Sequence, residues 1–271
     1  MLKTLLYINE DLASSIALRF TDYLSRFVKL SLFIAHVEEP DEKEQVGTGW
    51  VRRTWEDGVA SSGKRLVDRM LRTENISCPL AGRPKIFVGE MEKELLFELR
   101  NGLYKLFIKG YLDSANPELF YDLISSPLCA ETSSPVLVVK NLSLSKKCAL
   151  LCADSVDPRV LVEKTMEILG ESSFEIDIVY FKFQENNQVQ ILNHEEGGSN
   201  LRETESLLAE AGKTVAATTV LSGAPEQIGD YLKDYALVAS TMPQRKSMHM
   251  YVLAHSLASV LLVRDPAQKQ Q

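Results

Sequence analysis

Polar side chains that could bind a small ligand follow the apolar strands in the second half of the chain. Asp154 comes directly after the apolar run 147–153, Ser240 and Thr241 lie at the end of another run, and Ser247 precedes a helix-period segment. Ligands of open α/β sheets bind outside the carboxyl ends of the strands, so these groups are candidates for one site. Asp154 can accept hydrogen bonds from a nucleobase or ribose, and the hydroxyls can bind phosphate beside a helix start. The structural alternatives are that Asp154 organises the following turn, which we favour, and that Ser247 is a helix N-cap.

Other kinds of catalytic or metal chemistry find no support in the sequence. His249 and His255 are six residues apart, so on a helix they do not share a face as metal ligands would. No phosphate-binding P-loop, nucleophile elbow or Ser-His-Asp arrangement is present. The cysteines have no paired C-x-x-C spacing and are expected to be reduced core thiols; they are Cys78, Cys129, Cys148 and Cys152. We therefore expect no metal site and no enzymatic activity.

The composition is that of a globular protein with an acidic balance. Of 271 residues, 45% are hydrophobic and 25% are charged, which excludes disorder and fibrous repeats. Lys and Arg number 30 against 37 Asp and Glu, and the net charge of -7 has the wrong sign for nucleic acid or anionic lipid. The apolar runs are much shorter than the roughly 20 residues of a membrane span, and no secretory signal is evident. The sequence thus predicts a cytoplasmic protein.

A pattern of strands and helices occurs twice along the chain. The paired apolar runs are 3–8 and 147–153, 30–37 and 174–183, 85–88 and 214–221, 105–109 and 236–240, and 134–139 and 259–263. Helix-period segments lie between them, and a loop is expected over 184–200. In one helix the buried stripe is predicted to hold Val51, Trp55, Val59, Leu66 and Met70, with Trp50 outside it as a possible partner contact.

Strands that alternate with helices indicate parallel sheets, because parallel neighbours need long crossovers. The handedness of such crossovers predicts two doubly wound domains, each with a five-stranded parallel sheet. We place the first domain at residues 1–141 and the second at 146–267, joined by the polar linker that starts at Asn141. The last six residues are expected to form a frayed tail.

Three segments carry a resemblance to a known family. They are Ala153-Asp154-Ser155 after the first strand of the second half, Ser222 to Ile228 after its third, and Pro135 to Val139 at the end of the first half. The chain resembles a tandem universal stress protein over nearly its whole length, once per half. The resemblance implies an adenine-nucleotide α-hydrolase-like fold and two domains face to face, as in the family's homodimers. The last strands, 135–139 and 259–263, are then edges that can pair with one another.

Many members of that family bind ATP through G-x-x-G, nine residues, and then G-S or G-T. Glycines at these places let consecutive N–H groups face phosphate. In the first half Gly110 matches the first glycine, but the position three later is Asp113, whose charge opposes a triphosphate, and no Gly-Ser pair follows. Asn9 stands where the family usually has Asp. The resemblance therefore predicts a degenerate loop in this half.

The second half keeps more of the family's pattern, with Asp154 and Ser155 retained and Ser247 at the place of the family's Ser or Thr. Ser240 replaces the first glycine, however, and Pro243 has no N–H to donate. The loop from Ser240 to Ser247 is short and contains no glycine, so it is not expected to wrap a triphosphate. Arg245 and Lys246 can still attract a smaller anion at the helix start.

Taken together, these features predict a non-catalytic, cytoplasmic stress-response protein with degenerate nucleotide loops and no cofactor. Its expected partners are its own paired domains, a possible second copy and an unidentified protein, but neither nucleic acid nor membrane. The alternative is a module that senses AMP, ATP or a small anion through Asp154, Ser240 and Ser247. A third hypothesis, a weak nucleotide hydrolase, would depend on Asp113 or Asp154 as its carboxylate.

Overall fold

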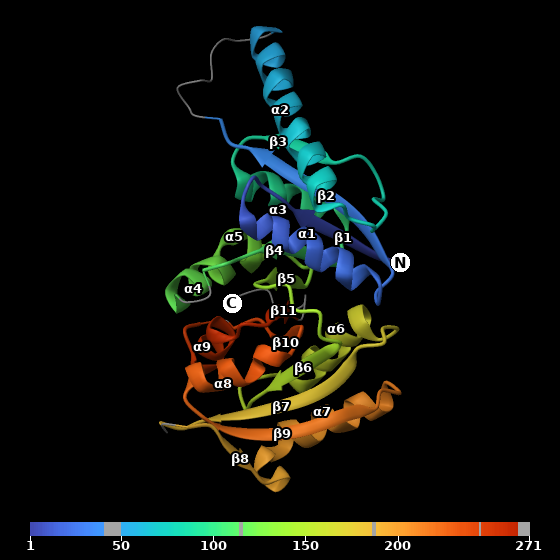
Figure 1. Ribbon diagram of the computed structural model, residues 1–271. Helices are drawn as coiled ribbons and strands as arrows, with labels where there is room; N and C mark the ends of the chain where they lie inside the picture. Colours follow the sequence, from blue (N-terminus) through green and yellow to red (C-terminus); the bar gives the residue numbers. More distant parts are fainter. Residues whose placement is uncertain (41–49, 114–115, 186–187, 244, 265–271) are drawn as a thin grey trace.

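The first half of the chain forms a five-stranded parallel unit. The computed structural model describes residues 1–40, 50–113, 116–185, 188–243 and 245–264. The strands of this half are β1 (Leu2–Tyr7), β2 (Leu30–Glu38), β3 (Lys85–Val88), β4 (Leu106–Gly110) and β5 (Val136–Val139), and its helices are α1 (Leu12–Ser25), α2 (Trp50–Glu74), α3 (Met91–Gly102), α4 (Pro117–Ser125) and α5 (Pro127–Glu131). The strands pair in parallel in the order β3-β2-β1-β4-β5, and helices cover both faces (Figure 1).

The second half repeats this plan with one additional strand. Its strands are β6 (Lys147–Cys152), β7 (Glu175–Phe183), β8 (Gln190–Leu192), β9 (Val215–Gly223), β10 (Leu237–Thr241) and β11 (Ser259–Val263), and its helices are α6 (Pro158–Leu169), α7 (Gly198–Glu210), α8 (Pro225–Tyr231) and α9 (Met248–His255). Short 3-10 turns occupy His194–Gly197 and Leu232–Asp234. β8 pairs antiparallel with β9, with Ile191 opposite Leu221. The predictions of a loop over 184–200 and of a purely parallel five-stranded sheet are therefore wrong here, because this segment pairs with the edge that β9 would otherwise leave open.

Several helix ends follow the local sequence signals. The Asp157 carboxylate accepts hydrogen bonds from the main-chain N–H groups of Arg159 (2.9 Å) and Val160 (3.2 Å) at the start of α6. Pro158 is the first residue of that helix, where no N–H is needed. The Ser247 hydroxyl accepts from the N–H of Met250 (3.3 Å) at the start of α9. The N-cap interpretation of Ser247 is confirmed, and Asp157 caps α6 in the same way.

The two halves join where β5 pairs antiparallel with β11. Leu137 lies opposite Leu261, Val138 opposite Val260 and Val136 opposite Leu262, and both strands are fully buried. The pairing unites the two sheets in the order β3-β2-β1-β4-β5-β11-β10-β6-β7-β9-β8 (Figure 1). The expectation that these two last strands pair with one another is confirmed.

A basic residue directly follows β5 and reaches into the second half. The Lys140 ammonium donates to the carbonyl oxygens of Leu253 (2.6 Å), Ala254 (3.0 Å) and Ser256 (3.1 Å) at the end of α9. It also lies 4.3 Å from the centroid of the Phe120 ring. The last carbonyls of a helix have no partner within the helix, so the N–H groups of the Lys140 side chain supply the hydrogen bonds that they lack.

Arg264 makes the equivalent contact in the opposite direction. It directly follows β11, and its guanidinium donates to the carbonyl oxygens of Cys129 and Ala130 in α5. Cys129 and Ala130 lie 11 and 10 residues before Lys140. Leu253 and Ala254, which Lys140 contacts, lie 11 and 10 residues before Arg264, so the two pairs of carbonyls occupy equivalent places in the two halves. The junction therefore has an approximate twofold symmetry, as a dimer interface between identical domains would.

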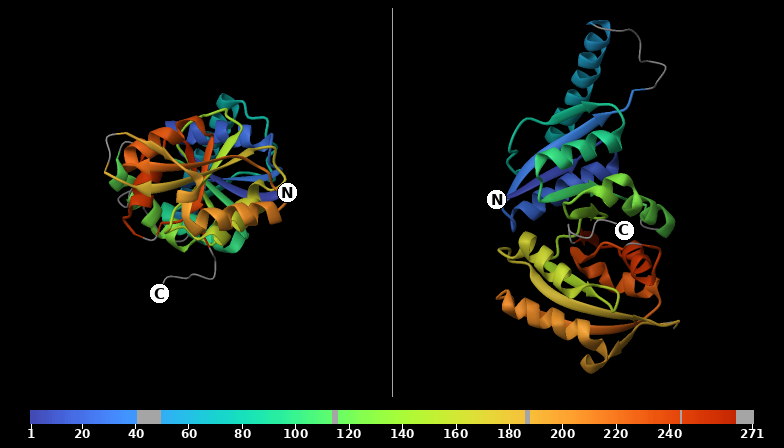
Figure 2. Two further views of the ribbon diagram at one scale, coloured as in Figure 1. Left: turned by 90° about the horizontal axis from the view of Figure 1, so that it is seen from below. Right: turned by 180° about the vertical axis from the view of Figure 1, so that it is seen from behind.

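Helix α2 differs from the buried helix that the sequence predicts. Met70 is buried and Leu66 packs against the core, but Val51 is 41% exposed and neither Trp55 nor Val59 packs against the core. The N-terminal half of α2 projects beyond the sheet (Figures 1 and 2). The prediction of a buried stripe is correct only for the second half of the helix, because helical spacing places residues on one face without deciding what covers that face.

The four cysteines are free and buried, as expected. Burial raises the pKa of Cys148 and of Cys152 to about 12, so both thiols stay protonated near neutral pH. Within the described ranges, no helix combines the length and the apolar character needed to cross a bilayer.

The buried Lys140 amine leads to a prediction about stability and pH. Burial lowers its pKa to about 7, well below the value of about 10.4 for a lysine in an unfolded chain. Between these pH values the unfolded chain binds more protons than the folded one, so stability rises with pH. We expect the free energy of unfolding, measured with urea, to increase by about 2 kcal/mol between about pH 7 and about pH 9. The Lys140→Met variant should lack this increase, and equal pH dependence in both proteins would contradict the assignment.

Candidate functional site

The structure brings the predicted second-half residues to one edge of the sheet, beside the junction of the two halves. Ser155, Thr241 and Ser247 line a cavity of about 700 Å³ at the carboxyl ends of β6, β10 and β11. Asp154 and Ser240 do not line it. A cavity of this volume falls within the range usual for small-molecule sites.

Both halves of the chain contribute walls to this cavity. The first half supplies Tyr121 and Ile124 from α4 and Ala130 from α5, and the second half adds Arg245 and Arg264 to the hydroxyl groups. α4 also packs directly against α9. The cavity therefore depends on the junction, and the second half alone would leave it open on one side.

The Asp154 carboxylate has a partner inside the protein. One of its oxygens accepts a hydrogen bond from the Tyr180 hydroxyl of β7. Burial, this hydrogen bond and the negative charge of Asp154 together raise the pKa of Tyr180, so the phenol remains a donor. A ligand that used this carboxylate oxygen would have to compete with Tyr180.

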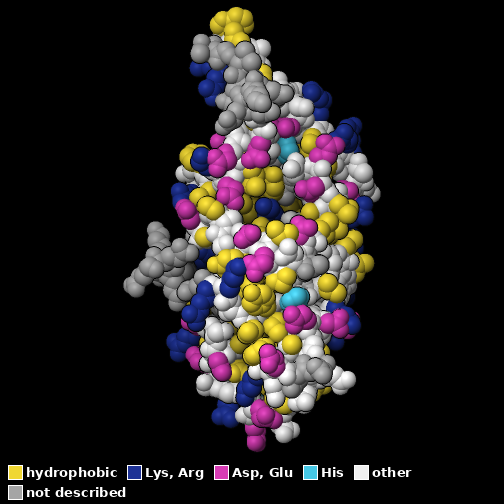
Figure 3. Space-filling model, turned by 90° about the vertical axis from the view of Figure 1, so that its left-hand side faces the viewer, with side chains coloured by type: hydrophobic (Ala, Val, Ile, Leu, Met, Phe, Trp, Pro, Cys, Tyr) yellow, Lys and Arg dark blue, Asp and Glu magenta, His cyan; other side chains and the backbone are white. Residues whose placement is uncertain are grey.

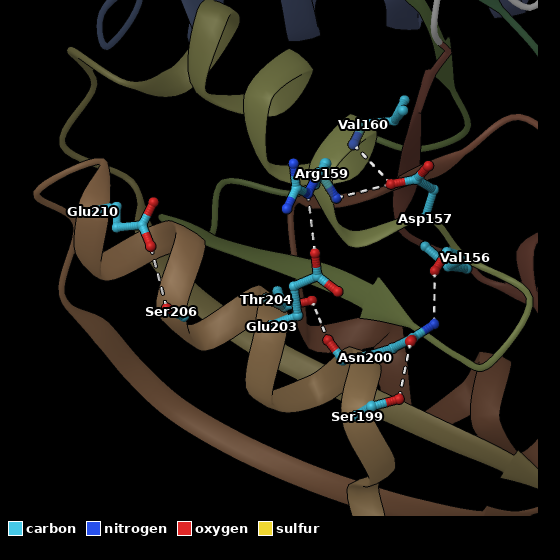
Figure 4. A network of polar contacts seen from close by, with 10 residues as sticks. All are labelled: Val156, Asp157, Arg159, Val160, Ser199, Asn200, Glu203, Thr204, Ser206 and Glu210. Carbon is cyan, nitrogen blue, oxygen red and sulfur yellow. Dashed lines mark hydrogen bonds and ion pairs between the residues drawn. The ribbon is translucent and has the colours of Figure 1, made fainter.

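Asn200 holds the turn between β6 and α6. From α7, its side-chain amide donates to the carbonyl oxygens of Ala153 (3.1 Å), Asp154 (3.3 Å) and Val156 (3.0 Å), and Figure 4 shows it facing Val156. The side chain of Asp154 bonds to Tyr180 instead of this turn, so the favoured interpretation of Asp154 as the organiser of the turn is wrong. Asn200 lies far away in the sequence, which gives no signal for its role.

Ser240 is fully buried and also has internal partners. Its hydroxyl donates to the carbonyl oxygen of Leu151 (3.0 Å), so it accepts from Nε2 of His249 at 2.7 Å. Burial lowers the pKa of His249 to about 4, which keeps the ring neutral near pH 7. His249 therefore brings no positive charge to the cavity, and Ser240 is not exposed to a ligand there. No group of three or more His, Cys, Asp or Glu side chains among the described residues is placed to hold a metal ion.

The basic residues near the cavity have two different roles. Lys246 forms an ion pair with Glu118 of α4 and lies 5.1 Å from the centroid of the Tyr121 ring, so it serves the junction. Arg245 and Arg264 line the cavity and form no ion pair with any residue that the structure describes, although the Arg264 guanidinium also donates to the α5 carbonyls across the junction. Asp157 also lines the cavity, and its carboxylate caps α6. The lining therefore holds two arginines against one carboxylate, a balance that suits a small anion.

The corresponding place in the first half is closed by packing. A Cβ atom at Gly110 would overlap the carbonyl oxygen of Ala13 in α1, so the glycine allows α1 to approach β4. Asn9 accepts a hydrogen bond from the N–H of Glu10 (2.8 Å) through its side chain and donates from its own N–H to the Ser14 hydroxyl (2.8 Å). Gly110 and Asn9 are therefore used in local packing and turn contacts.

Sequence reasoning missed Arg264, Tyr121, Tyr180 and Asn200 as residues of this region. Only Arg264 has a signal that could have been found, since a basic residue follows the last strand of both halves, Lys140 in the first and Arg264 in the second. The other three act through contacts with distant segments, and nothing in their local sequence marks them.

The whole fold is similar to solved structures of universal stress proteins. A universal stress protein from Archaeoglobus fulgidus DSM 4304 shares 14% identity, with 96% of this chain and 95% of that chain covered at a TM-score of 0.59. A protein of unknown function from Pseudomonas aeruginosa PAO1 shares 14% identity, with 98% and 93% covered at a TM-score of 0.56. No protein-family model and no curated protein sequence matches the chain.

Similarity at this level of identity concerns the fold. Because the match extends over nearly both full chains, the whole two-domain arrangement is shared and not only one α/β unit. The chain therefore has the same two-unit α/β fold as the solved universal stress protein from Archaeoglobus fulgidus. The fold expected from the sequence is confirmed.

The packing of Gly110 can be tested with a pair of alanine variants. Gly110→Ala should lower the free energy of unfolding by about 1–3 kcal/mol, because the new methyl group forces α1 away from β4. Gly58→Ala is the matched control on exposed α2, where a Cβ meets nothing within 4 Å, and it should stabilise by about 0.5–1 kcal/mol. Urea unfolding measures both changes. A Gly110→Ala protein as stable as the wild type would show that the glycine is free of α1, as a phosphate-binding glycine would be.

Proposed function

We propose that this chain is a non-catalytic protein of the universal stress protein type, in which the nucleotide loops have degenerated and which acts by binding other proteins. The main support is that groups at both predicted nucleotide sites already pack against, or form hydrogen bonds with, other parts of the chain. Gly110 packs on Ala13, Asp154 bonds to Tyr180, and Ser240 bonds to His249. A triphosphate would have to displace these contacts without the glycine N–H groups that usually compensate for such a loss.

Isothermal titration with ATP, together with an assay of ATP hydrolysis, tests this proposal. We expect no binding heat at micromolar ATP and hydrolysis no faster than in buffer, because the loop offers no cradle for three phosphates. A control titration with AMP separates recognition of the nucleoside from recognition of the phosphate chain. Tight ATP binding would overturn the degenerate-loop proposal, and turnover above the buffer rate would overturn its non-catalytic part.

A second candidate function is supported by the cavity at the junction. In it the protein would sense a small anion or a nucleoside monophosphate, held by Arg245, Arg264 and the hydroxyl groups of Thr241 and Ser247. Two cationic groups in the lining suit a single phosphate better than an extended triphosphate chain. Because both halves form the cavity, a bound anion would also strengthen their contact.

Thermal unfolding with inorganic phosphate or AMP distinguishes this second candidate. Ligand that binds only the folded protein raises the melting temperature, and the shift should disappear in Arg245→Ala. Arg202→Ala is the control, because Arg202 is exposed on α7 and does not line the cavity. Absence of any shift in the wild type would reject anion sensing and leave the protein-binding proposal unaffected.

A further inference from the structure

The hydrogen bonds around His249 determine which of its two ring nitrogens carries a hydrogen. His249 lies in α9, is only 5% exposed and lines the junction cavity. The Ser240 hydroxyl donates its hydrogen to the carbonyl oxygen of Leu151, so Nε2 of His249 carries the hydrogen that joins it to Ser240. Burial keeps the ring neutral by lowering its pKa to about 4, and a neutral imidazole has a hydrogen on one nitrogen only. Nδ1 therefore has a lone pair and can only accept.

This Nδ1 acceptor has no partner in the described part of the chain. No described residue donates a hydrogen bond to it and, unlike the hydroxyls of Thr165 and Ser256, it is not sealed from solvent. Because His249 lines the cavity, the access that Nδ1 retains is toward the cavity. A largely buried acceptor is costly to leave without a donor, so a ligand in the cavity must supply a hydrogen to it or lose binding energy.

The Asp157 carboxylate is a second acceptor in the lining. Its Oδ1 accepts the main-chain N–H groups of Arg159 and Val160 at the start of α6, and no described residue donates to its Oδ2. Arg245 and Arg264 supply the opposite kind of group, because a guanidinium only donates. The cavity thus presents both donors and acceptors to a ligand.

Binding of an anion depends on these lining groups, because the molecule as a whole does not attract one. The net charge is -7, and Figure 3 shows acidic and basic side chains interspersed over one face. An anion that has only lone pairs can accept from the arginines, but it also sets lone pairs against those of His249 and Asp157. An anion with an O–H group avoids this conflict, since it can donate there while its other oxygens accept from the arginines.

We propose that the junction cavity selects an oxyanion that carries its own O–H group, hydrogen phosphate being the simplest, and that Nδ1 of His249 accepts that hydrogen. Arg245 and Arg264 donate to the remaining oxygens. This inference rests on the anion-sensing candidate above and adds a requirement on the ligand. Sulfate is tetrahedral like phosphate but has no O–H group near neutral pH, so the cavity should reject it. The selection acts against the wrong ligand through a lone pair left without a hydrogen, and not through size.

Isothermal titration of the full chain with phosphate, arsenate and sulfate, at neutral pH and equal ionic strength, tests the proposal. Phosphate and arsenate both keep an O–H group, so we expect them to bind at least about tenfold more tightly than sulfate. Failure of all three anions to bind would overturn this inference together with the anion-sensing candidate. Sulfate binding as tight as that of phosphate would overturn this inference alone and leave the anion site in place.

The variant His249→Gln tests the role of Nδ1. A glutamine amide can still donate to Ser240 from the place of Nε2, but it has no acceptor at the place of Nδ1. We expect the preference for phosphate over sulfate to fall to within about threefold. His255→Gln is the matched control, because His255 is in the same helix and does not line the cavity, and it should keep the wild-type preference.

Thermal unfolding without ligand checks that both variants fold. A folded His249→Gln protein with the full preference for phosphate would contradict the assignment to His249, as would an equal loss of preference in His255→Gln. The comparison of the three anions in the wild type needs no variant, so it decides the ligand requirement even where the glutamine variant does not fold.

Discussion

The pairing of β5 with β11 is the contact on which the arrangement of the two halves depends. Without it, each sheet would end in a buried apolar strand with unpaired backbone groups, which is costly in water and prone to aggregation. Lys140 and Arg264 reinforce the pair by donating to helix carbonyls of the opposite half. Separation of the halves would therefore expose two strand edges and leave both sets of carbonyls without donors. The chain behaves as one unit with an internal twofold axis and not as two domains on a flexible linker.

This fixed junction also determines the character of the candidate site. α4 and α5 of the first half lie against the second half, so the carboxyl ends of β10 and β11 face a shared cavity and not an open cleft. Buried polar groups need partners, and in this protein Tyr180, Asn200 and His249 supply them within the chain. The result is an ordered site with few free hydrogen-bonding groups. Arg245 and Arg264 are the cationic groups that face the remaining space.

The helices and strands of the chain differ in how much of their apolar surface is buried. Strands and most helices bury their apolar faces in the two cores or at the junction, whereas α2 buries only its second half. The pairing of β5 with β11 satisfies the strand edges at the junction of the two halves. Trp50 and Val51 are exposed at the projecting end of α2, away from this junction.

The sequence alone determined the duplicated order of strands and helices, the cap at Ser247 and the buried cysteines. These features depend on periodicity and on hydrogen bonds between near neighbours, which the local sequence records. The pairing of the last strands was expected only from the resemblance to a known family. The tertiary structure alone decided the extra strand β8, the packing of Gly110 on Ala13, the partners of Asp154 and Ser240, and the projection of the N-terminal half of α2 beyond the sheet. Each of these depends on which distant segment comes to lie beside a residue, and helical or strand spacing contains no information about that choice.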